Sequence, residues 1–210
     1  ATMGSPLTRE QRQEAGAIPN LELRESSYKL EWMDSAWEDV ARAGDWLLDL
    51  EQSYRPDLVH LNGYTHGALS WQAPVIVAAH SCVLSWWRAV HGCPAPAQWN
   101  RYRQAVSAGL HAADLVIAPS RTMLEALFQD YGPLAQARVI ANGRTLPPLP
   151  PQPKEQLVLT AGRFWDKAKN LEALNAIAPE LPWPVYAAGE PLTTQAAPND
   201  GLRLLGRLSS

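Results

Sequence analysis

Cysteine is scarce in this 210-residue sequence, and the scarcity limits the kinds of structure to consider. The two cysteines, Cys82 and Cys93, have neither the CxxC spacing of a redox motif nor the spacing of metal ligands. We interpret them as reduced thiols of a cytoplasmic protein, with one disulfide between them as the alternative. The 46% of hydrophobic residues is ample for a core, so we expect a globular chain.

Long apolar runs and basic stripes are also absent. The longest apolar run is far shorter than the roughly 20 residues that a membrane-spanning helix needs, and no charged-then-apolar signal segment opens the chain. We therefore expect a cytoplasmic location and no integral membrane segment. The net charge of -3 argues against nucleic acid as a partner, so any anion-binding site must be local.

What the sequence does contain is a regular alternation of short apolar runs and helical patterns. Continuous apolar runs rich in β-branched residues are typical of strands that are buried on both faces of a parallel sheet. Their alternation with helices predicts an α/β fold. Predicted strands span 58–61, 74–79, 115–118, 138–140, 157–160, 185–188 and 202–205, with a short strand at 21–23; predicted helices span 8–15, 34–54, 98–113, 120–132 and 170–178.

Two of these helices have capping signals at their starts. Ser35 and Glu38 have the spacing of a capping box before the second helix. Ser120 is the predicted N-cap of the helix that Gly132 and Pro133 end. Between the strands at 138–140 and 157–160 the sequence LPPLPPQP, at 146–153, favours extended polyproline geometry. We therefore predict a domain over 1–144, a proline-rich linker over 145–156 and a partial second domain over 157–210.

His80 stands directly after the apolar run at 74–79. In open α/β sheets, ligands bind beyond the carboxyl ends of the strands, which makes His80 the best single candidate for chemistry. The alternative is a buried histidine that is hydrogen-bonded to backbone.

In the second half, Arg163, Lys167 and Lys169 lie between a predicted strand and a predicted helix. Cations beside a helix N-terminus can complete a phosphate-binding site. The alternative is that these residues are ordinary solvated surface.

Four motifs, taken in order, resemble the GT-B glycosyltransferases of family 4. They are AHS at 79–81, ADLVIAPS at 113–120, VIANGR at 139–144 and AGRFWDKAKNLEAL at 161–174. The resemblance implies two Rossmann-like domains, with a nucleotide-diphospho-sugar donor held mainly by the second. It also implies transfer with retention at the anomeric carbon, without a metal or another cofactor.

The same resemblance assigns roles to individual residues. Arg163 and Lys169 match the pair that binds the donor diphosphate, although one extra residue separates them here and leaves Lys167 as a rival. His80 matches the histidine directed at the donor sugar, and Glu190 is a candidate donor contact. Candidate acceptor or sugar contacts are Asn62, Trp86, Trp87 and Arg88, since aromatic faces pack against sugars; the alternative is that the tryptophans and Arg88 cap the hydrophobic core.

The sequence also departs from the family pattern. The first strand with its glycine-rich loop is not found, nor is the C-terminal half of the second domain with its pair of glutamates. Glu172 and Glu180 have the right spacing, but Pro179 interrupts them. We therefore expect the interior of a longer enzyme, with both domains incomplete and an unfinished sheet edge near 202–205 that invites self-association.

The favoured function is glycosyl transfer from a nucleotide-sugar to an acceptor hydroxyl. The alternative is a noncatalytic truncated fragment that acts as a sugar-binding or partner-binding module. A nicotinamide-dependent dehydrogenase is disfavoured because no GxGxxG follows any predicted strand. A GT-B sugar-nucleotide epimerase is supported by fold analogy alone.

Overall fold

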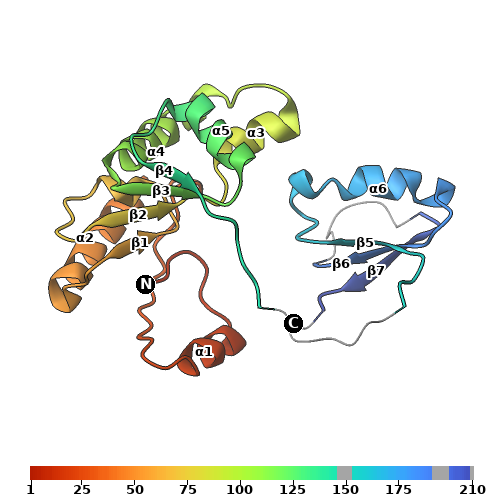
Figure 1. Ribbon diagram of the computed structural model, residues 1–210, viewed down its shortest axis with the longest axis horizontal. Coiled ribbons are helices and arrows are strands. Elements are labelled where there is room, and N and C mark those ends of the chain that lie inside the picture. Colours follow the sequence, from red (N-terminus) through yellow and green to blue (C-terminus); the bar gives the residue numbers. More distant parts are fainter. Residues whose placement is uncertain (146–152, 191–198, 209–210) are drawn as a thin grey trace. The chain divides into compact units, whose positions relative to one another are not determined.

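The chain divides into two compact units, seen in a computed structural model that describes residues 1–145, 153–190 and 199–208 (Figure 1). The first unit comprises Ala1–Arg88 and Gly92–Gly143, and the second comprises Ala89–His91 and Arg144–Ser210. Most of the predicted proline-rich linker, residues 146–152, lies outside the described residues. In the part of the chain that is described, every helix is too short or too polar to cross a lipid bilayer.

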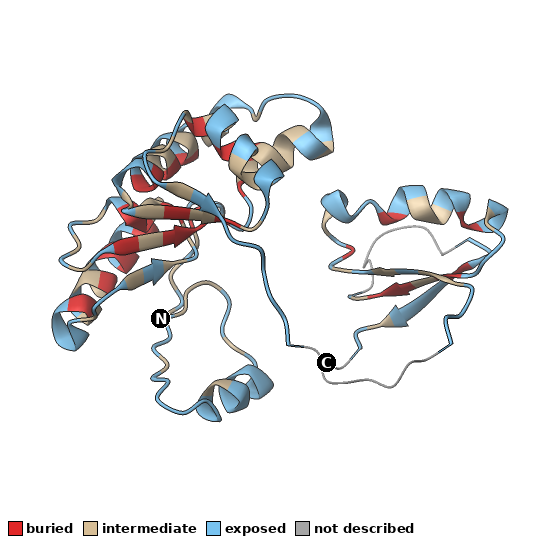
Figure 2. Ribbon diagram, in the orientation of Figure 1, coloured by how far each residue is buried: buried red, intermediate tan, exposed pale blue. Residues whose placement is uncertain are grey.

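The first unit is built on a parallel sheet. Its described strands follow the order β1-β2-β3-β4, and Val77 of β2 lies opposite Val116 of β3. Both valines are almost completely buried, as expected for central strands made of consecutive apolar residues (Figure 2). The strands are β1 (Val59–Leu61), β2 (Val75–Ala78), β3 (Leu115–Ala118) and β4 (Ala137–Val139).

Helices complete the core of this unit. Val106 and Leu110 of one helix and Leu127 of another are at most 2% exposed and join the strand valines in one hydrophobic cluster. Ser120 accepts a hydrogen bond from the Met123 amide at 3.1 Å, which confirms the predicted N-cap. The helices are α1 (Arg9–Gly16), α2 (Trp37–Tyr54), α3 (Val83–His91), α4 (Asn100–Ala112) and α5 (Arg121–Tyr131), with 3₁₀ turns η1 (Thr65–Ala68) and η2 (Ala97–Trp99).

The chain that follows β1 packs unusually close to α4. A Cβ atom added to Gly109 would lie 1.9 Å from the Tyr64 carbonyl oxygen, and one added to Gly67 would lie 2.5 Å from the Gly109 carbonyl oxygen. Only glycine allows backbones to approach this closely. The two glycines therefore hold the segment after β1, which begins at Asn62, against a rigid helix.

The second unit is a smaller parallel sheet, whose described strands follow the order β5-β6-β7. Its core centres on Val185 and Ala187 of β6, which pack with Phe164, Leu171 and Leu202. Among the described strands β7 is paired on one side only, at the edge predicted near 202–205; self-association through it stays a prediction. The elements are β5 (Val158–Ala161), η3 (Lys167–Lys169), α6 (Leu171–Ile177), η4 (Ala178–Glu180), β6 (Val185–Ala188) and β7 (Leu202–Gly206).

Three local predictions are wrong. Ser35 does not cap α2, because it has a positive φ of 53° and Ala36 occupies the N-cap position without a side-chain hydrogen bond. Residues 21–23 form no strand; an isolated bridge joins Thr2 to Glu25 instead. The disulfide alternative also fails, since Cys82 is buried, Cys93 is exposed and both thiols are free.

Candidate functional site

His80 and Asn62 lie at the carboxyl ends of neighbouring strands and contact each other. Nε2 of His80 is 2.9 Å from Oδ1 of Asn62, and both residues are exposed. Because an amide oxygen only accepts, Nε2 carries the proton in this pairing. The interpretation of His80 as a buried, backbone-bonded histidine therefore does not hold. His66 fits that description instead, since it is 6% exposed and its Nε2 lies 2.9 Å from the Val40 carbonyl oxygen.

A buried carboxylate and a buried phenol support this strand edge. Glu31 accepts hydrogen bonds from the backbone amides of Tyr64 at 3.0 Å and Thr65 at 2.8 Å. The Tyr64 hydroxyl donates to the Ser81 carbonyl oxygen at 2.7 Å, so it joins the segments that follow β1 and β2. Burial raises the pKa of Tyr64, which keeps this donor protonated. Sequence reasoning missed Glu31, because the residues that it binds lie 33 and 34 positions away along the chain.

Helix α3 carries three of the candidate acceptor or sugar contacts, Trp86, Trp87 and Arg88. Trp86 and Trp87 meet edge to face, with ring centroids 6.3 Å apart. The Arg88 guanidinium forms two hydrogen bonds with Asp130, at 2.7 and 3.1 Å, and this pairing raises the pKa of Arg88. The structure therefore fixes Arg88 against α5, where the Asp130 side chain is only 6% exposed.

The second unit brings together Arg163 and Glu190, which the sequence places 27 residues apart. Each directly follows a glycine at the end of a strand, Gly162 after β5 and Gly189 after β6. The Gly162 amide donates to the Ala188 carbonyl oxygen at 2.9 Å, and a Cβ on Gly189 would lie 1.8 Å from the Gly162 carbonyl oxygen. The two strand ends thus leave the sheet in close contact.

Trp165 lies between these two charged side chains, and sequence reasoning did not single it out. The Arg163 Cζ atom is 5.2 Å from the centre of the Trp165 ring, a cation–π contact. The Trp165 indole N–H donates to Glu190 Oε2 at 3.2 Å. One aromatic side chain therefore contacts both the candidate diphosphate ligand and the candidate donor contact.

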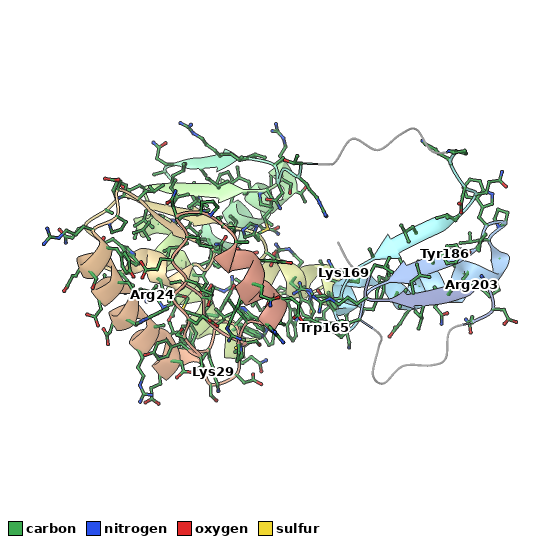
Figure 3. The ribbon with its side chains drawn as sticks, turned by 90° about the horizontal axis from the view of Figure 1, so that it is seen from below. Arg24, Lys29, Trp165, Lys169, Tyr186 and Arg203 are labelled. Carbon is green, nitrogen blue, oxygen red and sulfur yellow. The ribbon has the colours of Figure 1, made fainter. Side chains whose placement is uncertain are left out.

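Lys169 lies with Trp165 at the end of the second sheet where β5 and β6 leave it, whereas Tyr186 and Arg203 lie along the strands (Figure 3). A Cβ on Gly162 would lie 3.4 Å from both Cγ and Cδ of Lys169, so the lysine stem covers the residue before Arg163. The turn that presents Lys169 is capped by Asp166, whose side chain accepts from the Ala168 amide at 2.9 Å. The assignment of Lys169, rather than Lys167, as the second diphosphate ligand stays a prediction.

Comparisons with known proteins identify a family and a fold. The family model of Glycosyltransferase Family 4 matches residues 5–146. No curated protein matches the chain. A solved structure of sucrose-phosphate synthase from Thermosynechococcus elongatus matches with a TM-score of 0.61 at 20% identity, over 83% of this chain and 51% of that one. The chain thus spans about half the length of that synthase.

The match confirms the predicted fold class, GT-B with two Rossmann-like parallel-sheet domains. Within the described residues the two sheets have four and three strands, fewer than the six of a complete dinucleotide-binding fold. Both domains are therefore incomplete in this chain, as the motifs predicted.

Proposed function

The chain belongs to glycosyltransferase family 4, and on that premise we propose that it takes part in moving a sugar from a nucleotide-diphospho-sugar donor to an acceptor hydroxyl, with retention of anomeric configuration. The observation that supports the donor class is the gathering of Arg163, Lys169 and Glu190 around the adjacent glycines of the second sheet. Two of these side chains are cations on exposed loops at the carboxyl ends of parallel strands, where α/β sheets bind their ligands.

The Arg163 contact suits it to binding phosphate. The Arg163 Cζ atom lies 5.2 Å from the centre of the Trp165 ring, and a guanidinium can stack on an aromatic face. A guanidinium stacked in this way keeps the N–H donors on its edge available for a bidentate pair with phosphate oxygens. Lys169 adds a second positive charge, as a point donor rather than a planar fork.

These two cations would stabilise the charge that forms when the sugar–phosphate bond breaks, the difficult step of the proposed reaction. When the sugar–phosphate bond breaks, the electron pair stays on the diphosphate while the sugar becomes oxocarbenium-like. Preplaced positive charges stabilise the departing anion, and one such donor is worth roughly 3 kcal/mol of activation free energy. The proposal therefore includes neither a metal nor another cofactor.

In the first unit we assign His80 to the donor sugar, following the family resemblance. Asn62 fixes the imidazole through the 2.9 Å contact, which gives Asn62 a positioning role. Trp86 and Trp87 stay candidate acceptor or sugar contacts. Arg88 stays one too, although Asp130 already binds two of its nitrogens.

A transfer assay tests this function. The purified chain is incubated with ADP-, GDP- and UDP-sugars and a panel of sugar acceptors, and released nucleoside diphosphate and glycosylated product are measured. We expect product whose new linkage, read by NMR, keeps the anomeric configuration of the donor. An inverted linkage would contradict retention. Binding of nucleotide-sugar without release or transfer would instead identify the noncatalytic binding module.

A further inference from the structure

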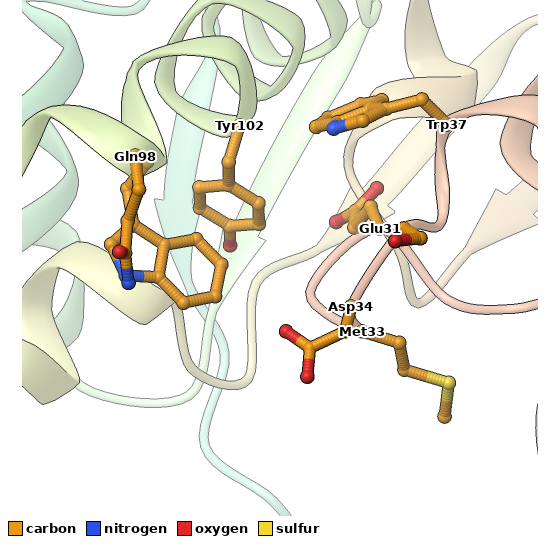
Figure 4. A pocket seen from close by; sticks show the side chains of 8 residues that line it. Glu31, Met33, Asp34, Trp37, Gln98 and Tyr102 are labelled. Atoms are coloured by element: carbon orange, nitrogen blue, oxygen red, sulfur yellow. The ribbon is translucent and has the colours of Figure 1, made fainter.

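The first unit contains a pocket that none of the assigned site residues lines (Figure 4). Its volume is about 260 Å³, below the roughly 300–1,000 Å³ of pockets for drug-sized ligands, which suits a single small ring. Two stretches far apart in the sequence form its walls. They contribute Glu31, Met33, Asp34, Ser35 and Trp37 from one side, and Gln98, Trp99 and Tyr102 from the other.

The aromatic part of the lining offers both ring surface and an unused donor. Trp99 and Tyr102 meet edge to face with centroids 5.7 Å apart. The Trp99 indole N–H is buried and has no hydrogen-bond partner among the described residues. A buried indole N–H usually finds an acceptor, and this one lacks it.

The polar part of the lining is acidic. Glu31 and Asp34 contribute carboxylates, Gln98 contributes an amide, and the lining includes no lysine, arginine or histidine. Two cations contact lining residues without lining the pocket themselves: the Lys29 ammonium donates to the Asp34 carbonyl oxygen at 3.0 Å, and the Arg101 guanidinium lies 4.7 Å from the centre of the Trp37 ring. Hydroxyl groups can donate to these carboxylates, whereas a phosphate would be repelled.

The pocket is joined to the strand edge that bears His80. Glu31 is held in place by the amides of Tyr64 and Thr65, in the segment after β1. The Tyr102 hydroxyl accepts at 3.3 Å from the amide of Val83, the first residue of α3 after the segment that follows β2. The lining is thus fixed by the same two chain segments that position Asn62 and His80.

We propose that this pocket binds an unphosphorylated sugar ring as the acceptor, an inference that rests on the proposed glycosyl transfer. Hydroxyl groups of the sugar donate to Asp34 and Glu31, and one sugar oxygen accepts the Trp99 N–H. The pocket selects against sugar phosphates through its two carboxylates.

Binding without any donor present tests this assignment. Saturation-transfer NMR measures the affinity of the full chain for D-glucose, D-mannose and D-galactose, each against its 6-phosphate. We expect at least one hexose to bind, with its 6-phosphate roughly tenfold weaker because of charge repulsion. Trp99→Phe, which removes the indole N–H but keeps a ring, should weaken the hexose roughly fivefold. Trp183→Phe, an exposed tryptophan of the other unit, is the matched control.

Asp34→Asn tests the charge selection independently of folding, since Asp34 is exposed. The variant should narrow the difference in affinity between a hexose and its 6-phosphate, while Asp45→Asn, the same charge change at an exposed position on α2, should not. Failure of every hexose to bind, equal or tighter binding of the phosphates, or variants that match their controls would overturn the proposal. Hexose binding as expected but no transfer in the donor assay would leave the pocket assigned and refute the proposed function instead.

Discussion

Trp165 shows how one side chain can organise a site made of loop residues. Arg163 and Glu190 are both exposed, so neither is held by burial. The Trp165 ring lies beside the guanidinium, and its N–H binds the Glu190 carboxylate at 3.2 Å. Opposite charges that both contact one rigid aromatic lose less freedom when a donor binds than two free side chains would.

Trp165→Phe separates these two contacts. The variant keeps an aromatic face for Arg163 but removes the donor to Glu190, so we expect kcat/KM for the nucleotide-sugar to fall about fivefold, the loss of one hydrogen bond. Trp165→Leu also removes the cation–π contact, so its kcat/KM should be lower still. Steady-state kinetics measure both. Equal kcat/KM for wild type, Trp165→Phe and the control Trp183→Phe would contradict a positioning role for Trp165.

At the scale of single residues, the sequence offered candidates for the site but did not predict what their side chains contact. Strand-end position pointed to His80, and motif position pointed to Arg163 and Lys169, because a local pattern marks each. Glu31 was missed because its hydrogen bonds reach 33 and 34 residues along the chain. Contacts of that length depend on tertiary packing, which leaves no mark on neighbouring residues.

At the scale of elements, α4 and the segment after β1 approach so closely that the contact requires glycine at two positions. Gly109 and Gly67 face each other across this contact, and Asn62 begins the segment that they hold. A side chain at either position would push the backbones apart, since packed interiors have no spare volume.

Gly109→Ala should therefore destabilise the chain by about 2 kcal/mol or more, within the range for overpacking in a close contact. Urea unfolding followed by tryptophan fluorescence measures the change. Gly16→Ala is the matched control, because a Cβ there meets no atom within 4 Å. Unchanged stability of Gly109→Ala would show that α4 can move away from Tyr64 without cost.

The elements themselves were largely predictable. The bounds of β3 and β6 agree with the predicted 115–118 and 185–188, because strands buried on both faces are continuous apolar runs. The start of α2 was not predicted correctly. Ser35 adopts a positive φ and cannot cap the helix, despite its favourable spacing to Glu38. Residues 21–23 do not form the predicted strand; the pairing in this region is the isolated bridge between Thr2 and Glu25, just beyond them.

For the whole molecule, family membership and fold are established, while the reaction is a proposal. Each unit presents its candidate residues at the carboxyl ends of parallel strands: His80 with Asn62 in the first, and Arg163 with Lys169 in the second. The charge of the full chain is -3, so the local pair of cations, rather than the general field of the protein, must attract an anionic donor.

The most direct test is the turnover number for nucleoside diphosphate release from the nucleotide-sugar, compared among Arg163→Ala, Lys169→Ala and Lys167→Ala. We predict that Arg163→Ala and Lys169→Ala each lower kcat by about a hundredfold or more, because each removes a charge that stabilises the departing diphosphate. Lys167→Ala removes the same charge from the same turn and should stay within about twofold of wild type. Wild-type turnover in both Arg163→Ala and Lys169→Ala would contradict the account.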